Sequence, residues 1–219
     1  VHCHGAKANT VGVYLKMTLG CTVITTVHSD YRLDYMHSFL RRQTFGRVNS
    51  AALRLVDYDV TVSDNFKKML IQRGFCPNNI LTIYNGLDFS TPTPDFDRAE
   101  YLRQCGLDYE EGDVVLGIAA RLTPVKDIPT LLRAFAKAHG REPRLKLLIG
   151  GDGEDMEKLM NLAKELGVEQ QACFCGWVTD IGKFFKACDI DVLCSISESF
   201  PYSILEGVKE HCAVITSDV

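Results

Sequence analysis

Short apolar segments alternate with segments of helical length along the second half of the chain. The apolar segments are residues 114–118, 145–149, 172–175, 191–194 and 213–216. The segments of helical length that follow the first four are residues 128–139, 155–166, 181–188 and 201–209. Continuous apolar runs of this length, separated by helices, are typical of a parallel sheet that is covered on both faces. The pattern therefore predicts an α/β domain.

The first part of the chain repeats this alternation. The predicted elements are strands at residues 21–27, 59–63 and 80–84 and a helical region at residues 35–55. A boundary is expected within residues 86–95, because the segment Thr91-Pro92-Thr93-Pro94-Asp95 disfavours both helix and sheet. The sequence thus predicts two α/β domains, residues 1–89 and residues 90–219.

The composition is that of a soluble globular protein, with 46% apolar and 24% charged residues. No apolar run approaches the roughly 18 residues of a membrane span. The chain starts at Val1-His2-Cys3-His4, without an initiator Met or a signal peptide, and stops at Val219 directly after an apolar run. We therefore expect a fragment that lacks residues at both ends.

The nine cysteines are odd in number, include no Cys-x-x-Cys pair and lie mostly in apolar runs. This usage favours a reducing cytoplasm over a secreted, disulfide-bonded protein. The one close pair, Cys173 and Cys175, is expected on the same face of a strand. Because no further soft ligands lie near it in the sequence, we expect no zinc site.

Charge is shared unevenly along the chain. Residues 1–90 hold 10 Lys and Arg against 6 Asp and Glu, whereas residues 91–219 hold 14 against 22. The asymmetry suggests two domains with different partners, although chance scatter of solvated charges accounts for it as well. The dense basic and aromatic pattern of a nucleic-acid-binding protein is absent from the sequence, so no nucleic-acid partner is expected.

Unusual residues follow four successive predicted strands of the second domain. In order, they are Arg121 and Lys126, then Gly151, Asp152 and Gly153, then Gly176 and Trp177, and last Ser197, Glu198 and Ser199. Ligands of open parallel sheets bind at the carboxyl ends of the strands. Two cations, glycines and a carboxylate at that edge predict a pocket for a polyphosphate that carries a sugar. The alternatives are that the cations are merely solvated and that the glycines only form a tight strand-to-helix turn.

The segment from Ser197 to Glu206 gives the sharpest prediction. Pro201 suits the first turn of a helix, and Ser199 is a plausible cap just before it. Such a helix start directs N–H groups and the positive end of the dipole towards an anion. Glu198 and Glu206 on either side of it are expected to bind neutral hydroxyls, such as those of a sugar and a ribose.

These residues resemble the retaining GT-B glycosyltransferases of family four, also called group 1 glycosyl transferases. The elements that carry the resemblance are Gly117–Leu122 with Lys126, Gly151-Asp152-Gly153, Gly176-Trp177-Val178, the Glu-x7-Glu pair Glu198 and Glu206, and upstream Val62-Ser63 and Ile83–Asp88. The resemblance covers nearly the whole chain. It implies two Rossmann-like domains that face each other across a cleft, with acceptor contacts in the first and the donor site in the second.

The resemblance also implies residue roles. Arg121 and Lys126 would neutralise the donor diphosphate, Glu198 with the backbone N–H groups of Ser199 and Phe200 would hold the sugar, and Glu206 would hold the ribose. Gly151 and Gly153 would line the donor site, the main chain at Trp177 and Val178 would meet the nucleobase, and His28 would reach the sugar from the acceptor domain. Three residues depart mildly from the family pattern: Ser199, Gly207 and His211.

The implied reaction is transfer of a sugar from a nucleoside-diphosphate sugar to a hydroxyl acceptor, a glycan or a lipid-linked molecule, with retention of configuration. Attack occurs on the front face, so Glu198 is not expected to be a nucleophile. The resemblance implies no obligatory metal and no other cofactor. The alternatives are a nucleotide-sugar epimerase and a non-catalytic sugar-nucleotide-binding protein, and the chain by itself could be inactive as a fragment.

Two groups of residues in the first domain each allow two interpretations. His2 and His4 form a His-x-His pair that we place at the inter-domain cleft rather than at a metal. Arg41, Arg42, Arg47 and Arg54 lie in the helical region, where they suit either a solvated helix face or peripheral contact with anionic lipid at the inner face of a membrane.

Overall fold

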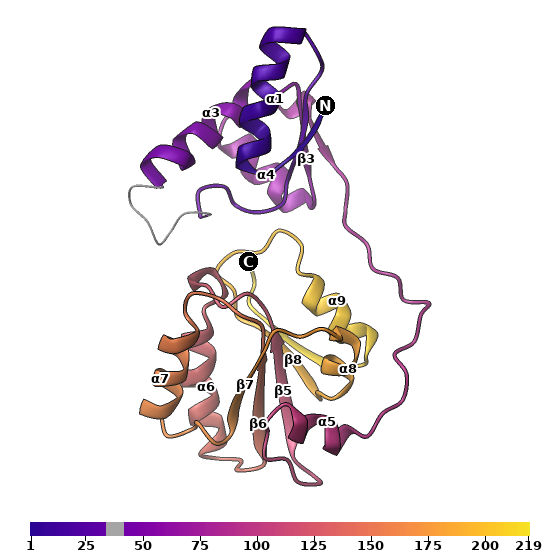
Figure 1. The fold of residues 1–219 in the computed structure, drawn as a ribbon, viewed down its shortest axis with the longest axis vertical. Coiled ribbons are helices and arrows are strands. Elements are labelled where there is room, and N and C mark those ends of the chain that lie inside the picture. Colours follow the sequence, from indigo (N-terminus) through magenta and orange to yellow (C-terminus); the bar gives the residue numbers. More distant parts are fainter. Residues whose placement is uncertain (34–41) are drawn as a thin grey trace. The chain divides into compact units, whose positions relative to one another are not determined.

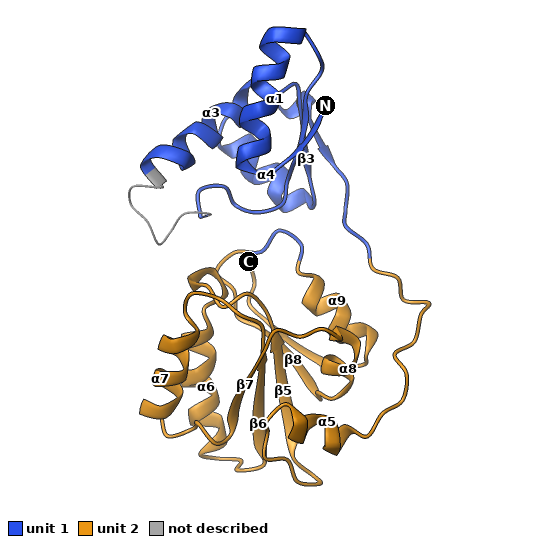
Figure 2. Ribbon diagram, in the orientation of Figure 1, with its two compact units in different colours: residues 1–86, 198–200 blue, residues 87–197, 201–219 orange. Residues whose placement is uncertain are grey.

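The computed structural model describes residues 1–33 and 42–219, and these form two compact α/β units. Unit 1 comprises residues 1–86 and 198–200, and unit 2 comprises residues 87–197 and 201–219 (Figure 2). Each unit contains its own parallel sheet and its own apolar core.

Unit 1 has a four-stranded parallel sheet in the order β1-β2-β3-β4. The strands are β1 (His2–His4), β2 (Ile24–Val27), β3 (Tyr58–Thr61) and β4 (Ile80–Thr82). The helical elements are α1 (Ala6–Leu19), a π-helical turn (Arg42–Gly46), α3 (Arg47–Leu55), α4 (Asp64–Gln72) and a short 3-10 turn (Pro77–Asn79). The predicted strands are therefore present but shorter than expected.

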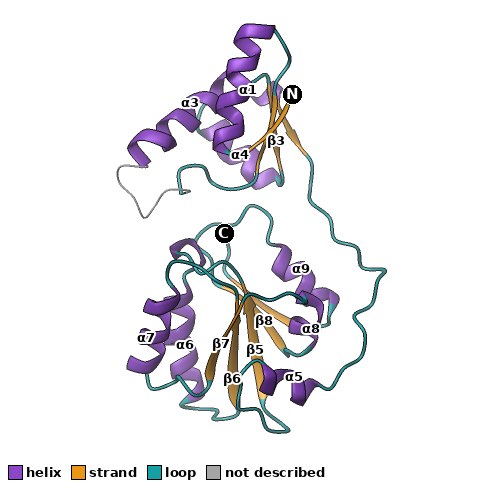
Figure 3. Ribbon diagram, in the orientation of Figure 1, coloured by secondary structure: helices purple, strands orange, loops and turns teal. Residues whose placement is uncertain are grey.

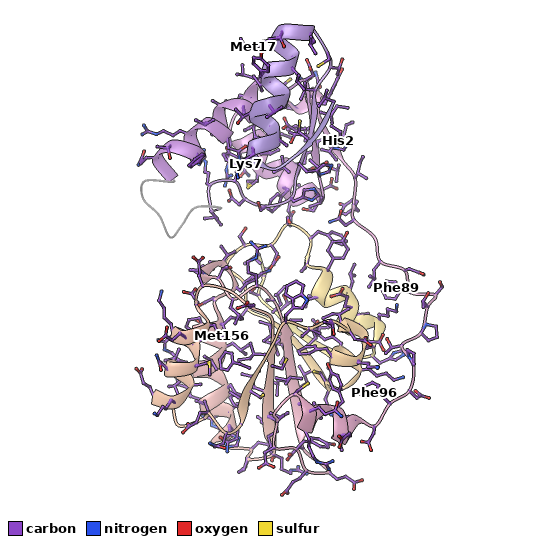
Figure 4. All side chains as sticks on the ribbon, in the orientation of Figure 1. His2, Lys7, Met17, Phe89, Phe96 and Met156 are labelled. Carbon is purple, nitrogen blue, oxygen red and sulfur yellow. The ribbon has the colours of Figure 1, made fainter. Side chains whose placement is uncertain are left out.

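The first helix, α1, was not predicted. Its outward positions include Val11, Tyr14 and Met17, which are all exposed, so its sequence shows no clear polar face. The side chain of Met17 extends from the helix in Figure 4. The predicted helical region at residues 35–55 is observed from residue 42 onward, and residues 34–41, including Arg41, lie outside the described part of the chain.

Unit 2 has a five-stranded parallel sheet in the order β7-β6-β5-β8-β9 (Figure 3). The strands are β5 (Val114–Ala119), β6 (Leu145–Gly150), β7 (Ala172–Gly176), β8 (Ile190–Leu193) and β9 (Ala213–Thr216). The helices are α5 (Arg98–Gln104), α6 (Ile128–His139), α7 (Met156–Glu165), α8 (Ile181–Lys186) and α9 (Tyr202–Lys209). The alternation in the sequence thus predicted every strand of this sheet to within about two residues.

Both faces of this sheet are covered, as continuous apolar strands require. One face packs against α6 and α7 through a cluster that includes Leu132, Phe135 and Leu159. The other face packs against α5 and α8 through a cluster that includes Leu102, Phe184 and Phe185. Figure 1 shows the two groups of helices on opposite sides of the strands. The cysteine pair on β7 lies on a single face as predicted, because Cys173 and Cys175 both belong to the second cluster.

The loop after β2 is fixed by a nearly buried ion pair within unit 1. The guanidinium of Arg73 donates to both carboxylate oxygens of Asp30, at 2.7 and 2.6 Å, and also lies over the ring of Tyr31. Burial raises the pKa of Asp30, but the hydrogen bonds from Arg73 and from the Arg32 backbone outweigh it, so the pKa is lower than usual. The loop that carries His28 is therefore anchored to the end of α4.

We expect Arg73→Met to destabilise unit 1 by about 3 kcal/mol, because it leaves the Asp30 carboxylate buried without its partner. The double variant Arg73→Met/Asp30→Asn should recover most of this loss. Arg103→Met, which removes an exposed pair with Glu100, is the control and should cost less than about 0.5 kcal/mol. Urea unfolding followed by circular dichroism measures all three, and a cost at Arg73 no greater than at Arg103 would contradict the argument.

Candidate functional site: the carboxyl edge of the unit 2 sheet

Loops from four strands meet at the carboxyl edge of the unit 2 sheet. The loop after β5 carries Arg121 and a 3-10 turn, Pro124–Lys126, and the loop after β8 leads into α9. Arg121 is exposed and Lys126 is partly buried. Because parallel strands end at one edge, residues far apart in the sequence are brought together there.

The loops after β5 and β6 are joined through their backbones. The Leu122 N–H donates to the carbonyl of Asp152 at 2.9 Å, and the Asp155 N–H donates to the carbonyl of Leu122 at 3.2 Å. A Cβ at Gly153 would lie 2.7 Å from the carbonyl carbon of Leu122, closer than side chains pack. Only glycine fits at this crossing.

Gly151 is under a second constraint. It has a φ of 125°, and a Cβ there would lie 2.9 Å from the carbonyl carbon of Ala120. Its N–H donates to the carbonyl of Gly176 at 2.7 Å, which ties the loop after β6 to the end of β7. Gly151 and Gly153 therefore have a packing role within unit 2, and direct contact of either with a donor stays a prediction.

Cys194, which was not among the site residues predicted from the sequence, holds the loop after β8 against the 3-10 turn. The thiol of Cys194 donates to the carbonyls of Lys126 and Asp127, at 3.1 and 3.3 Å. Burial and the charge of Asp127 raise the pKa of this thiol to about 11, so it remains a donor at neutral pH. The Ile196 N–H also donates to the carbonyl of Val125 at 2.8 Å. The backbone around Lys126 is thus held by hydrogen bonds from two residues of the loop after β8.

Glu206, in the second turn of α9, lines a cavity of about 430 Å³. Burial raises the pKa of its carboxyl, and the charge of Lys209 one turn later acts in the opposite direction. The other walls are the segment 91–94 with Leu87, the loop 179–182, and Lys209 and Glu210. The cavity therefore combines a half-buried carboxylate with hydroxyls, backbone groups and a cation.

Residues 91–94, near the start of unit 2, form one wall of this cavity. The sequence predicted only a domain boundary at these residues. The hydroxyl of Thr93 donates to Glu210 at 2.7 Å. Lys186 donates to the carbonyl of Thr93 at 2.9 Å and to the carboxylate of Asp95 at 2.7 Å. Gly182 gives room for this approach, because a Cβ there would meet the side chain of Thr93.

The predicted cap of the helix that carries Glu206 is wrong. The helix α9 begins at Tyr202, with Pro201 in an extended conformation at the N-cap position and no side chain capping it. Ser199 belongs with Glu198 and Phe200 to unit 1, where its hydroxyl donates to the carbonyl of His28 at 2.5 Å. Serine is a favoured residue at helix N-caps, but the hydroxyl of Ser199 is engaged in this tertiary hydrogen bond instead. By contrast, Asp180 caps α8 as expected of an N-cap carboxylate.

Trp177 and Val178 follow β7 but have different surroundings. The side chain of Trp177 is 78% exposed. The side chain of Val178 packs against the core cluster that includes Phe184, and a Cβ at Gly150 would meet it. The indole is therefore available on the surface, and a contact of the main chain here with a nucleobase stays a prediction.

Three histidines lie close together in unit 1, two on β1 and one directly after β2. His4 Nδ1 and His28 Nε2 share a hydrogen bond of 2.9 Å, and His2 Nε2 lies 2.8 Å from the hydroxyl of Thr26. Burial and then the charges of His4 and His2 lower the pKa of His28. Among the described residues, no group of three or more His, Cys, Asp or Glu side chains is placed to hold a metal ion.

A second cavity, of about 620 Å³, lies in unit 1 between α1 and the turn that leads into α3. Val11, Phe45 and Val48 give it apolar walls, and Lys7 also lines it. Lys7 is labelled in Figure 4. Of the arginines considered for lipid contact, Arg54 has an internal role: it donates to the carbonyl of Arg73 at 2.7 Å and its guanidinium lies over the ring of Phe75. No helix in the described part of the chain has the length and apolar character needed to span a membrane.

Models of two known glycosyltransferase families match the two parts of the chain. The model of the glycosyl transferases group 1 matches residues 106–219, and that of glycosyltransferase family 4 matches residues 1–91. The chain belongs to the group 1 glycosyl transferases, as its motifs indicated.

Individual relatives agree with this family. Over its full length the chain is 24% identical to the O-antigen biosynthesis glycosyltransferase WclY of Escherichia coli, covering 61% of that protein. It is 25% identical to the UDP-Gal:alpha-D-GlcNAc-diphosphoundecaprenol alpha-1,3-galactosyltransferase of the same species, covering 57% of it. The chain therefore spans about three fifths of the length of these curated relatives.

Solved structures show the same fold. All of the chain superimposes on 60% of Anabaena Alr3699/HepE in complex with UDP-glucose, with a TM-score of 0.84 and 23% identity. Some 95% of it superimposes on 62% of WaaG, a glycosyltransferase involved in lipopolysaccharide biosynthesis, with a TM-score of 0.73 and 18% identity. The predicted GT-B class of two parallel-sheet α/β units is confirmed.

We expect Gly153→Ala to destabilise unit 2 by about 1–3 kcal/mol, because the new methyl group forces the two crossing loops apart. Gly140→Ala is the matched control. Its φ is −61° and its nearest neighbour atom would lie 3.5 Å away, so alanine there should be neutral or stabilise by up to about 1 kcal/mol. Urea unfolding measures the stability of the two variants. Equal midpoint concentrations of urea would show that the crossing of the two loops does not require glycine.

Proposed function

We propose that this protein is a glycosyltransferase that transfers a sugar from a nucleoside-diphosphate sugar to a hydroxyl acceptor with retention of configuration. The observation that carries the proposal is the carboxyl edge of the unit 2 sheet. Two cations follow β5 at this edge. On α9 a half-buried carboxylate, Glu206, lines a cavity whose walls do not include these two cations. Membership of the group 1 family supports this assignment of the chemistry.

Arg121 and Lys126 are proposed to neutralise the donor diphosphate. As the bond to the anomeric carbon breaks, negative charge grows on the leaving phosphate, and fixed cations lower the barrier because they stabilise that charge. The backbone at Lys126 is held by Cys194 and Ile196, so the residue approaches the phosphate from a preorganised turn. Preorganisation matters because a site that must reorganise during the reaction loses much of this stabilisation.

Glu206 is proposed to bind the ribose. An ionised carboxylate accepts hydrogen bonds only, so it suits a pair of neighbouring hydroxyls. Its partial burial raises its pKa and strengthens such hydrogen bonds, while Lys209 favours the ionised form. The cavity beside it is of the size expected for a small-ligand site.

The remaining roles come from the family pattern. Glu198, with the backbone N–H groups of Ser199 and Phe200, is proposed to hold the sugar hydroxyls, and His28 to contact the donor sugar. In front-face transfer the leaving phosphate accepts the proton of the acceptor hydroxyl, so Glu198 forms no covalent bond. The main chain at Trp177 and Val178 is proposed to contact the base.

Relatives indicate the classes of donor and acceptor to test first. The similar Anabaena protein is seen with UDP-glucose, and one Escherichia coli relative is named for a UDP-galactose donor and a diphosphoundecaprenol-linked acceptor. A glycan or lipid-linked acceptor is accordingly proposed, with contacts in unit 1, where the apolar walls and Lys7 of the second cavity suit an anionic lipid carrier.

Cytoplasmic location, peripheral membrane contact and catalysis without a metal or other cofactor are further parts of the proposal.

A thermal-shift screen against UDP-, GDP- and ADP-sugars tests donor binding directly. At least one nucleotide sugar should raise the melting temperature, and turnover with an acceptor should release a nucleoside diphosphate. Arg121→Ala and Lys126→Ala should each lower kcat/KM by about 100- to 1,000-fold, the equivalent of the roughly 2.7–4 kcal/mol that a charge-stabilising donor contributes. Arg103→Ala, on α5, is the matched control and should keep activity.

The alternatives give different results in the same assay. Interconversion of the sugar nucleotide without any acceptor would identify an epimerase. Binding without turnover, for every acceptor class tried, would identify a sugar-nucleotide-binding protein. If none of the nucleotide sugars stabilised the protein, the donor site itself would be refuted.

A further inference from the structure

Asp191 is a fully buried carboxyl in the middle of the unit 2 sheet. It lies on β8, between β5 and β9, and its side chain is 0% exposed. Neither of its carboxyl oxygens has a hydrogen-bond partner among the described residues. An ionised carboxylate in such a place is strongly unfavourable, so the group must be neutral or must gain a compensating partner.

The helix that carries Glu206 is shaped around this carboxyl. A Cβ on Gly207 would meet the side-chain oxygen of Asp191, and it would lie 2.7 Å from the Asp191 Cβ and 2.8 Å from its Cγ. Gly207 is buried and faces β8, and it directly follows Glu206 in α9. The glycine therefore lets the turn that presents Glu206 lie directly on the Asp191 side chain.

Within the described part of the chain, the groups that face Asp191 offer it no countercharge. From α9 comes Glu206, whose negative charge adds to burial in raising the pKa of Asp191 to about 7. From the ends of α8 and α9 come the thiols of Cys188 and Cys212, whose pKa values burial raises far above neutral pH. The paired residues of the neighbouring strands, Gly117 on β5 and Val214 on β9, carry no charge. The Asp191 carboxyl thus meets a like charge and two neutral thiols.

We propose that Asp191 is a positioning residue for the donor site: as a neutral acid it lets α9 seat on β8 and hold the Glu206 carboxylate at the cavity, and its ionisation unseats that turn. The inference rests on the proposed function, since it assigns Glu206 to the donor ribose. Asp191 itself contacts no ligand in this scheme.

The direction of the pH effect follows from which carboxyl holds the proton. Asp191 is the more deeply buried of the two, so it keeps its proton while the half-buried Glu206, beside Lys209, ionises and accepts hydrogen bonds from hydroxyls. Above about pH 7 both carboxyls carry charge, repel each other and favour movement of α9 away from β8. Donor affinity is therefore expected to fall as the pH rises through this range.

The same proton affects folding stability. Because the folded pKa of Asp191 is about 7 and its ordinary value is 3.8, the protonated native form gives stability that is fully present below the ordinary value. That stability is lost as the pH rises towards 7 and stays lost above it. This effect on stability is separate from donor binding and is measured without ligand.

The test compares the wild type with Asp191→Asn, which has nearly the same shape but cannot ionise. Calorimetry at pH 6.0 and 8.5 gives the dissociation constant of whichever of UDP-glucose, GDP-mannose and ADP-glucose binds the wild type most tightly. We expect the wild-type affinity to fall about tenfold, the equivalent of one pKa unit of coupling, and that of Asp191→Asn to fall less than about twofold. A nucleotide-sugar diphosphate diester does not titrate in this range, so the difference between the two proteins reports on Asp191.

Asp59→Asn is the matched control. Asp59 lies on β3 of unit 1, is also buried with an oxygen that lacks a partner among the described residues, and has a pKa raised by burial to about 7. Its replacement should change the pH dependence of thermal stability but leave the pH dependence of donor binding as in the wild type. An effect on donor binding equal to that of Asp191→Asn would show that general stability, rather than the contact with α9, is responsible.

A second variant protects the test against misfolding. The pair Asp191→Ala/Gly207→Ala removes the carboxyl and fills part of its space with the new methyl group, and it should bind donor with little pH dependence. Gly207→Ala alone should weaken donor binding at both pH values. Donor binding in the wild type with an unchanged pH profile in Asp191→Asn would overturn this inference alone, whereas no donor binding at either pH would overturn the proposed function as well.

Discussion

The close approach of two backbones at the carboxyl edge of unit 2 is the constraint on which the rest of the candidate site depends. Gly151 and Gly153 bring the loop after β6 against the loop after β5, nearer than any side chain permits. This contact fixes the backbone next to Arg121, and Cys194 fixes the same loop at Lys126. Arg121 and Lys126 are thereby carried on a loop held from two neighbouring strands, β6 and β8, which is the preorganisation that charge stabilisation requires.

The position of α9 depends on a different balance, between packing and charge. Most helices of unit 2 seat on the sheet through apolar side chains, but the α9 turn at Glu206 and Gly207 seats on the Asp191 carboxyl. Burying that group is tolerable only while it is neutral. The segment 87–95 adds a second restraint from the outside, because Lys209 donates to the carbonyl of Asp88 and Thr93 donates to Glu210. The cavity beside Glu206 is therefore bounded by elements whose contacts are largely polar.

The alternation of apolar and polar segments was enough to predict the unit 2 sheet, since a buried parallel strand leaves an unmistakable apolar run. Pattern and propensity failed where tertiary contacts decide. Ser199 had the right chemistry for a cap, yet its hydroxyl bonds to the carbonyl of His28 instead. Asp191 was only the first residue of the predicted strand 191–194, because burial and the lack of a partner cannot be read from residue type. Thr93 was part of a supposed linker, although it forms a wall of the cavity.

Gly207 is a residue whose identity only the structure explains. This glycine is one of the mild departures from the family pattern, and the sequence offers no reason for it. In the structure the reason is steric, because an alanine methyl would meet the side chain of Asp191. The two residues are therefore one unit: a carboxyl at 191 requires a glycine at 207, and an alanine at 207 leaves no room for the carboxyl. A change in the strand is thus coupled to the helix turn that presents Glu206, and this coupling is how a residue without ligand contact would influence the proposed donor site.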